Sequence, residues 1–583
     1  MNGLKSKRWR LAASVWLLAG CALSSAQKQE MQRASAAFRA GSAAYARGDL
    51  KTAQAQFGEV VKLAPDIEEG HAALGVVLYA QGDLEPAIGE LETALHLKPD
   101  DRTAEEDLAR AYSQAGSPEK AALLLKRMDG DAPLDAELMA LWARDLSAIA
   151  QTDAAIDVMR RATAAEPQSA VLLDQLGSLE AQKQNWPEAE SSFNAALQID
   201  PNLAPAHMHL GVVLGHEQQT VRAVAEMSRA AELDPKNAAI QYEWGNVLSA
   251  SGDDGDAMTH YQQAMNLDPN ATDAEYQMAL ALQRAGRSDE ALPLFRRVVA
   301  ARPAQAEPLI NLGLALVQTG HAKDAIPLYQ RAMGLDPQNS SVYLDIGAAY
   351  LQESDIDDAI AQLQDGLKNA PESPLLHYDL GLAYKLKDDL PDAIRELETT
   401  IHIQPDSPDA PYTLGILYMQ AGRFDDAVKN LRVALADRPD NGDGWSTLGS
   451  IYRQQGKNDE AAAALRKAIE LLPQQPGPHI TLAAVLQEEG KTADAAEERK
   501  QAAALTRVAV NRQRAMFSTN AGNVLLNKGQ IADAIADYQD AIASDPGYAE
   551  AHRQLAVALA QQGRMKEAAT ERQKAETLAP KTP

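Results

Sequence analysis

The chain has 583 residues, of which 45% are hydrophobic and only 5% aromatic, and its formal net charge at pH 7 is −26. This composition is typical of alanine-rich helices that pack through small contacts, and no alternating strand pattern accompanies it, so we expect an all-α chain. The charge argues against nucleic acid as a partner, because a polyanion would be repelled along most of this surface and no basic stripe with interleaved aromatic residues offsets the repulsion.

Residues 1–20 have the pattern of a secretory signal peptide. A basic start precedes an apolar stretch over residues 11–20, which is too short to span a bilayer but has the length of a signal core. We therefore expect export across the bacterial inner membrane. Loss of the four basic residues of this leader would change the net charge from −26 to −30.

The leader ends in the segment LAGC at residues 18–21, which resembles a bacterial lipobox, in which the cysteine thiol is acylated and becomes the new N-terminus. Cys21 is the only cysteine, so no intrachain disulfide can form. Because several acyl chains hold a protein stably on a membrane, we predict a lipoprotein anchored at Cys21 and facing the periplasm. The alternative is cleavage after Ala26, which would leave a soluble periplasmic or secreted protein. Residues 21–33 read as a tether or as an extension of the first helix.

From residue 34 the chain is repetitive, and proline recurs every thirty-four residues without a slip. A period this strict indicates one supersecondary unit stacked many times, since a single unit cannot bury its apolar face without a neighbour on each side. The prolines are Pro65, Pro99, Pro133, Pro167, Pro201, Pro235, Pro269, Pro303, Pro337, Pro371, Pro405, Pro439 and Pro473.

Other positions keep the same phase, and together they describe a helix hairpin. In the unit that closes at Pro439, Gly415 and Ala427 are the small residues at which two helices can cross closely. Gly422 is placed to end the first helix, and Pro439 prevents the second from continuing. The alanine position is filled in every unit, by Ala53, Ala87, Ala121, Ala155, Ala189, Ala223, Ala257, Ala291, Ala325, Ala359, Ala393, Ala427, Ala461, Ala495, Ala534 and Ala568.

This layout resembles the tetratricopeptide repeat, whose signature has a leucine-glycine pair, a tyrosine three residues on, an alanine, an aromatic residue and a closing proline. The resemblance covers residues 34–582 and implies an all-α solenoid of stacked hairpins that forms a right-handed superhelix. The fit is weakest around Trp142 and Met278. The leucine-glycine pair or a near equivalent begins at Leu74, Leu176, Leu210, Trp244, Leu312, Ile346, Leu380, Leu414 and Leu448.

The register slips once, because the interval from Pro473 to Pro546 is five residues longer than two periods. Arg499 and Arg572 occupy a position that is aromatic in units such as those of Phe193 and Tyr329. A charge there suits a solvent-facing terminal repeat, so the pattern predicts two ends of the array. We predict fourteen repeats over residues 34–502, an extended helix or hinge over residues 503–514, and two further repeats over residues 515–583. The alternative is one continuous array with a locally extended helix whose arginines are solvated.

The sequence lacks the motifs of common catalytic sites, including GxxxxGK(S/T), GxSxG, HExxH and CxxC. His207 and His209 lie two apart on a helix and would face different directions, so we expect no metal site there. Five histidines share one position of the repeat, where we expect packing with one ring nitrogen bonded. We therefore expect no enzyme, no metal and no cofactor. The five are His71, His207, His377, His479 and His552.

The resemblance places ligands in a concave groove lined by the first helix of each hairpin, and the groove positions in the middle of the chain form an apolar strip. Such a strip favours a protein or peptide partner. The alternative is that neighbouring helices bury part of it. The groove becomes more polar toward the N-terminus, at Arg110 and Arg144. The candidate partner-binding residues are Tyr276, Leu280, Ile310, Leu314, Val317, Leu344, Leu351, Tyr378, Leu382, Tyr412, Ile416 and Met419.

Two functions are consistent with these features. The first is an exported scaffold or adaptor that holds a protein or an extended peptide, in the assembly of an envelope, secretion or pilus complex. The second is a binding module for non-protein envelope material such as a saccharide. The strip lacks paired tryptophans that would favour sugar stacking, so the first is preferred. Asn246 and Asn523 occupy a position used to clamp carboxylates in similar repeats, but no lysine accompanies them, so we expect no such clamp.

Overall fold

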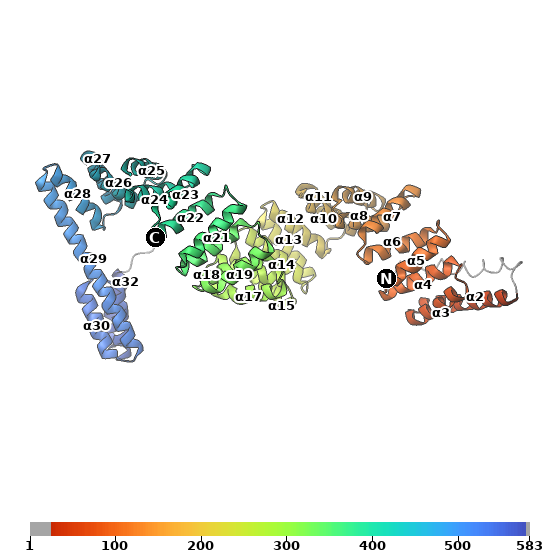
Figure 1. Ribbon diagram of the computed structural model, residues 1–583. Helices are drawn as coiled ribbons and strands as arrows, with labels where there is room; N and C mark the ends of the chain where they lie inside the picture. The colour runs from red at the N-terminus through yellow and green to blue at the C-terminus, as the bar shows by residue number, and fades with distance from the viewer. Residues whose placement is uncertain (1–24, 579–583) are drawn as a thin grey trace. The chain divides into compact units, whose positions relative to one another are not determined.

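The computed structural model describes residues 25–578, all of whose regular elements are α-helices. The helices pack as consecutive hairpins, which confirms the predicted all-α fold (Figure 1). The chain divides into two compact units, unit 1 ending at Pro303 and unit 2 beginning at Ala304. The predicted leader, residues 1–20, and Cys21 lie outside the described residues, whereas residues 25–33 of the predicted tether belong to the first helix.

Unit 1 contains sixteen helices from residue 25 onward. They are α2 (Ser25–Ala46), α3 (Leu50–Leu63), α4 (Glu68–Gln81), α5 (Leu84–Leu97), α6 (Arg102–Gln114), α7 (Pro118–Asp131), α8 (Ala136–Ala148), α9 (Thr152–Ala165), α10 (Ala170–Gln182), α11 (Trp186–Ile199), α12 (Ala204–His216), α13 (Thr220–Leu233), α14 (Ala238–Ala250), α15 (Asp254–Leu267), α16 (Thr272–Arg284) and α17 (Ser288–Ala301).

Unit 2 contains fifteen helices within its described residues. They are α18 (Ala306–Gln318), α19 (Ala322–Leu335), α20 (Ser340–Gln352), α21 (Ile356–Asn369), α22 (Pro374–Leu386), α23 (Leu390–Ile403), α24 (Ala410–Gln420), α25 (Phe424–Asp437), α26 (Gly442–Gln454), α27 (Asn458–Leu471), α28 (Pro476–Glu488), α29 (Thr492–Asn527), α30 (Ile531–Ser544), α31 (Ala549–Gln561) and α32 (Met565–Leu578).

The hairpin of α24 and α25 shows how the repeat residues set the fold. A Cβ atom on Gly415 would lie 2.7 Å from Leu431 Cγ, so only glycine allows the two helices to come this close. At the end of α24, Gly422 has a φ of +72°, and Arg423 N–H donates to the Tyr418 carbonyl at 2.8 Å. This is a Schellman motif, which satisfies the last carbonyl groups of the helix and reverses the chain.

In the hairpins that contain Gly177 and Gly313, a large side chain packs over the glycine within the same hairpin. A Cβ on Gly177 would lie 2.7 Å from Phe193 Cε1, and a Cβ on Gly313 would lie 2.6 Å from Tyr329 Cε1. Phe193 and Tyr329 are fully buried. The Phe193 ring also lies 5.6 Å from that of His209, which belongs to the next hairpin. Phe193 therefore packs in the core of its own hairpin and also contacts the next hairpin.

The turn between the two helices of a hairpin needs a residue in the left-handed region. Most hairpins use glycine there, with φ values such as +88° at Gly82. Five use another residue with φ between 58° and 67°, a conformation that is strained for a side chain with a Cβ. These five are Ala150, Gln184, Gln218, Ser354 and Asp388.

Helix α29 is the exception to the hairpin pattern. It runs for 36 residues and continues as a helix through residues 503–514, packing against α28 at one end and α30 at the other (Figure 1, blue). It therefore joins the second helix of one hairpin to the first helix of the next with no turn between them. The division of the chain into a long array and a C-terminal pair of repeats stays a prediction.

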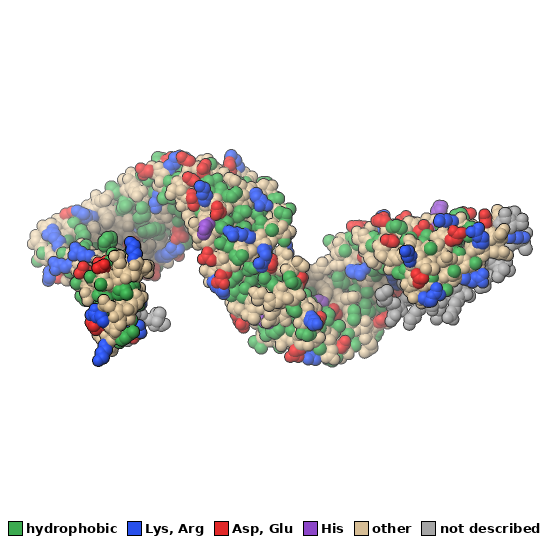
Figure 2. Space-filling view, turned by 90° about the horizontal axis from the view of Figure 1, so that it is seen from below, with side chains coloured by type: hydrophobic (Ala, Val, Ile, Leu, Met, Phe, Trp, Pro, Cys, Tyr) green, Lys and Arg blue, Asp and Glu red, His purple; other side chains and the backbone are tan. Residues whose placement is uncertain are grey.

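The described surface carries charges of both signs. Figure 2 shows acidic and basic side chains beside one another over the visible face, with apolar side chains between them. Over residues 25–578, no helix has both the length and the apolar character that crossing a membrane requires.

Candidate functional site

The predicted strip is distributed over the two units. Tyr276 and Leu280 belong to unit 1, and the other ten residues belong to unit 2. Tyr276 is 8% exposed, and its ring packs edge-on against that of Phe295 with centroids 6.2 Å apart. Its side chain is thus part of the core of unit 1, and only the half-buried Leu280 keeps appreciable exposure there.

In unit 2 all ten strip residues are half-buried. They lie on the first helices of four successive hairpins, and of these helices α18 contacts α20 and α20 contacts α22. A half-buried apolar side chain is held by the core yet offers part of its surface to a partner. The ten residues are Ile310, Leu314 and Val317 on α18, Leu344 and Leu351 on α20, Tyr378 and Leu382 on α22, and Tyr412, Ile416 and Met419 on α24.

Two further apolar residues, which the predicted strip does not include, extend it on α22. Leu375 is 60% exposed and Leu386 is 59% exposed. They lie three residues before Tyr378 and four after Leu382, a spacing that puts all four side chains on one helix face. This spacing was the signal that could have identified them. Helix α22 therefore presents the longest exposed apolar face among the four strip helices.

Two aspartates lie beside the strip and are partly withdrawn from water. Asp345 directly follows Leu344, and Asp379 directly follows Tyr378. Burial raises the pKa of each carboxyl from 3.8 to about 6. The charged form is disfavoured there because a carboxylate loses hydration when it is buried. A cationic group on a partner would restore that charged form.

Unit 1 contains a different kind of surface, a polar groove. It has a volume of about 1010 Å³ and is open to solvent on one side. The first helices of five successive hairpins, α4, α6, α8, α10 and α12, contribute to its walls. Residues from these helices include Tyr79, Arg110, Arg144, Asp174 and His209.

Hydrogen bonds connect the polar side chains of this groove from one hairpin to the next. Arg144 Nη2 donates to Ser113 Oγ at 2.7 Å, and Ser113 Oγ donates to Asp145 Oδ1 at 2.5 Å. Burial raises the pKa of Asp145 above its usual value. His209 Nδ1 lies 2.8 Å from Asp174 Oδ1. The groove thus offers hydroxyl, guanidinium and carboxylate groups that are already ordered.

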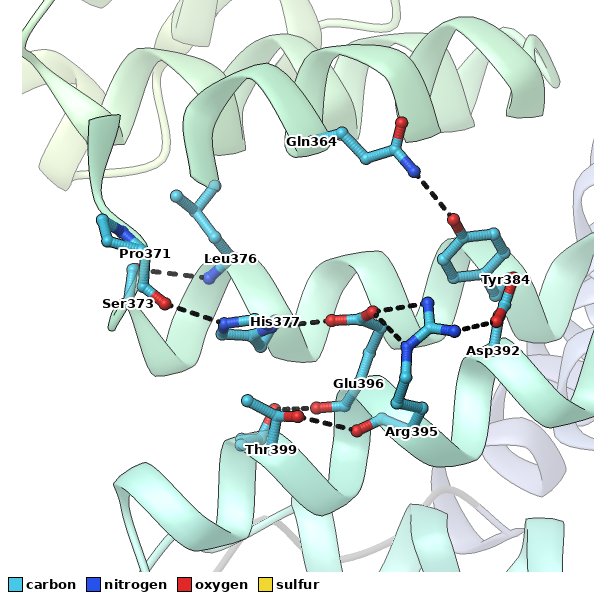
Figure 3. A network of polar contacts seen from close by, with 11 residues as sticks. Gln364, Pro371, Ser373, Leu376, His377, Tyr384, Asp392, Arg395, Glu396 and Thr399 are labelled. Carbon is cyan, nitrogen blue, oxygen red and sulfur yellow. Dashed lines mark hydrogen bonds and ion pairs between the residues drawn. The ribbon is translucent and has the colours of Figure 1, made fainter. Parts of the chain in front are cut away.

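The shared histidine position has a structural role. His377 Nδ1 lies 2.7 Å from Glu396 Oε2, and His377 Nε2 donates to the Pro371 carbonyl at 3.1 Å (Figure 3). Arg395 holds the other carboxylate oxygen of Glu396 at 2.9 Å. The expectation of one bonded ring nitrogen is therefore wrong here, since both are bonded. The imidazole joins both helices of its hairpin to the turn before it.

Other hairpins repeat this arrangement with the same or different donors. His71, His207 and His552 each contact a glutamate through Nδ1 and a proline carbonyl through Nε2, at 2.5 to 3.1 Å. Trp445 Nε1 fills the same position and donates to the Pro439 carbonyl at 2.9 Å. A side-chain donor to the closing proline carbonyl is what these residues share. No group of three or more metal-binding side chains occurs within residues 25–578.

The two asparagines at the clamp position are engaged inside their hairpins. Tyr261 Oη donates to Asn246 Oδ1 at 3.0 Å, and Tyr538 Oη donates to Asn523 Oδ1 at 2.8 Å. The tyrosines are the large core residues that pack over Gly245 and Gly522. These asparagines therefore orient core tyrosines.

Family models identify the repeats. Tetratricopeptide-repeat models match residues 38–101, 141–204 and 519–583, residues 78–144, and residues 273–304. A model of the C-terminal domain of cilia and flagella-associated protein 70 matches residues 300–516. No curated protein sequence matches the chain.

Solved structures that are similar to the chain include three repeat proteins. The anaphase-promoting complex hetero-tetramer Cut9–Hcn1 has 16% identity and a TM-score of 0.38, covering 92% of this chain and 99% of that one. YrrB, described as a TPR protein with an unusual peptide-binding site, has 24% identity and a TM-score of 0.29, covering 34% of this chain and 97% of its own.

MamA has 26% identity and a TM-score of 0.28, covering 29% of this chain and 92% of its own. The family models and the succession of helix hairpins agree on the repeat type. Over its described residues the chain is all-α and built of stacked helix hairpins, and the segments that these models match are tetratricopeptide repeats.

Proposed function

We propose that this protein is an exported scaffold or adaptor that binds a protein segment or an extended peptide on the apolar strip of unit 2. The observation that carries the proposal is the row of half-buried aliphatic and aromatic side chains on α18, α20, α22 and α24. Tyrosines such as Tyr378 and Tyr412 are favoured anchors, because they bury a large area at a small cost in conformational entropy. A scaffold that binds without catalysis needs no further chemistry.

Asp345 and Asp379 support a partner that is basic as well as apolar. Each carboxyl adjoins a strip residue and has a pKa raised by burial to about 6. A lysine or arginine on the partner would form a charge-assisted hydrogen bond there, and such bonds are stronger than neutral ones.

The strip is tested with the double variant Leu314→Glu/Leu382→Glu. We expect it to lose the proteins that the native chain captures from membrane extract, since two charges would lie in the path of an apolar partner. Val433→Glu is the matched control, because Val433 is 50% exposed on α25, a second helix of its hairpin. Identical capture by the double variant and the native chain would refute the strip as the binding surface.

We also propose that the protein is a lipoprotein anchored through Cys21 and facing the periplasm, where it contributes to an envelope, secretion or pilus assembly. The LAGC segment at residues 18–21 supports this proposal. Cys21→Ser should move the protein from the membrane pellet to the soluble fraction. Unchanged fractionation would refute the anchor and favour cleavage after Ala26.

The polar groove of unit 1 supports a second candidate function, the binding of saccharide from the envelope. Its ordered hydroxyl, guanidinium and carboxylate groups suit a ligand rich in hydroxyl groups. Titration with envelope oligosaccharides should show binding that Arg144→Ala weakens and Leu382→Glu leaves unchanged. Absence of saccharide binding by the native chain would leave the peptide scaffold as the remaining proposal.

A further inference from the structure

Helix α29 carries an exposed apolar stripe that lies outside the strip of unit 2. Ala503, Val510, Phe517 and Val524 follow one another at intervals of seven residues, so they lie along one face of the helix. We name these four residues the α29 stripe. Val510 is 47% exposed, Phe517 77% and Val524 53%. Phe517 is therefore a large aromatic side chain with most of its surface exposed to solvent.

In other hairpins the positions of Phe517 and Val524 are buried against the preceding hairpin, whereas in α29 both are exposed. Phe517 occupies the repeat position of Val342, Leu376, Ala410 and Ala551, all of which are 0% exposed. Val524 occupies the position of Ala383, Leu417, Ile451 and Val485, which are also 0% exposed. In those hairpins the first helix packs against the second helix of the preceding hairpin. Because α29 joins the two helices without a turn, no preceding helix covers Phe517 and Val524.

The other end of the stripe opens into a cavity between α28 and α29. This cavity has a volume of about 740 Å³ and is lined by Ala503 and Val510 of the stripe together with Ile480, Ala484 and Ala502. Ile480 is 56% exposed. Three of its lining residues are alanines, which leave room for an apolar side chain of a partner, and Arg499 and Arg507 also line it.

The charge on this helix differs from that of the whole chain. The net charge of the chain is −26, yet no aspartate or glutamate occurs between Arg499 and Asp533. Arg507 and Arg514 lie seven residues apart, and each is four residues after a stripe residue, so they flank the stripe on one side. Both are exposed. Arg512, in contrast, is bonded to Asp545 within the C-terminal hairpins.

We propose that the α29 stripe binds an amphipathic helix of a partner protein, with apolar side chains on one face and aspartate or glutamate beside them. Seven-residue spacing is the spacing at which one helix packs along another. The basic flank selects acidic residues on the partner by charge complementarity. The partner helix takes the place of the missing second helix and fills the cavity beside Ala503.

Two other occupants fit less well. A second copy of the chain that packed its own α29 against this one would bring its Arg507 and Arg514 close to the Arg507 and Arg514 of the first copy. These like charges would repel. An anionic membrane would be attracted by the arginines, but a flat bilayer cannot fill the concave space between α28 and α29. An amphipathic acidic helix would cover the stripe, fill the cavity and pair with the flanking arginines.

The proposal is tested with the full chain and a synthetic helical peptide that has leucine on one face and glutamate on both flanks. We expect the native chain to bind this peptide and not a sister peptide with lysine in place of glutamate. Phe517→Ser should weaken the affinity about tenfold or more, since the peptide would bury less apolar area. Arg507→Glu/Arg514→Glu should weaken it further and reduce its dependence on salt.

Val508→Ser is the matched control, because Val508 is 58% exposed on the opposite face of the same helix. It should leave the affinity unchanged, and circular dichroism should show that all variants keep the native helix content. Failure of the native chain to bind the glutamate peptide would overturn the proposal, as would equal binding of the lysine peptide or an equal effect of Val508→Ser. Capture by vesicles containing phosphatidylglycerol that is lost in Phe517→Ser would assign the stripe to a membrane surface instead.

Discussion

His377 Nδ1 lies 2.7 Å from Glu396 Oε2, joining α22 to α23 across the inside of one hairpin. His377→Leu would remove the donors to Glu396 and to the Pro371 carbonyl. Because Glu396 is only 7% exposed, the lost bonds should lower the free energy of unfolding by about 1 to 3 kcal/mol. Urea unfolding followed by circular dichroism measures the change. His402→Leu, on the exposed side of α23, should have a small effect, and equal losses for the two variants would contradict the prediction.

Gly415 and Gly422 should respond differently to alanine. Gly415→Ala places a Cβ atom 2.7 Å from Leu431 Cγ, and this overpacking should lower the free energy of unfolding by about 1 to 3 kcal/mol. Combining it with Leu431→Ala should cost less than the sum of the two single changes, because the shorter side chain makes room.

Gly422→Ala meets no neighbouring atom within 4 Å but has a φ of +72°. Its cost, about 1 kcal/mol, comes from the backbone, so Leu431→Ala should not relieve it. Thermal unfolding of the four variants separates the two causes. If Leu431→Ala reduced the cost of both glycine substitutions equally, the assignment of one cost to packing and the other to the backbone would be wrong.

Asp379 should make unit 2 less stable as the pH rises. Its carboxyl has a pKa of about 6 in the folded chain, raised by burial from 3.8. Between about pH 4 and pH 6 the unfolded chain therefore releases a proton that the folded chain retains, so stability falls across this window and levels off above it.

Asp379→Asn removes this titration. After allowance for solvent screening, it should raise the free energy of unfolding at pH 7 by about 1 kcal/mol and have little effect at pH 4. Urea unfolding at the two pH values measures the difference. The control Asp437→Asn, at an exposed position on α25, should change the free energy of unfolding equally at both pH values. A pH-independent effect of Asp379→Asn would refute the prediction.

The continuity of α29 should protect its middle from proteolysis. In the native chain, trypsin should cut slowly after Arg507 and Arg512, since both lie inside a 36-residue helix. Ala509→Pro should interrupt the helix at a cost of about 3 kcal/mol and release a C-terminal fragment. Ala509→Ser should remain resistant. Equally fast cleavage of the native chain would show that residues 503–514 act as a hinge.

The sequence predicted the hairpins because their determinants are local and repeated. Gly415, Gly422 and Pro439 each act within a few residues or across one hairpin, and the structure places Gly415 and Gly422 where the pattern required a close crossing and a left-handed turn. Thirty-four-residue periodicity makes such local evidence cumulative.

The sequence could not predict how far each groove side chain is exposed. Tyr276 shares its repeat position with Tyr378, yet it is in the core, where its ring packs edge-on against Phe295, whereas Tyr378 is half-buried. Phe517 shows the opposite outcome, since its position is buried in other hairpins of unit 2 and exposed only because α29 has no turn. Exposure depends on which neighbour is present, and a position within one repeat does not encode that.

The five turns without glycine have a consequence for heating. Each holds a side chain at a positive φ, which costs about 1 kcal/mol relative to glycine, and three of them, Ala150, Gln184 and Gln218, close successive hairpins of unit 1. Because each repeat of a solenoid is stabilised mainly by its neighbours, weak repeats in a row open before the others. On heating, the three hairpins closed by these residues should therefore unfold before the other hairpins of unit 1. Glycine at the three positions would remove this difference without changing any packed side chain.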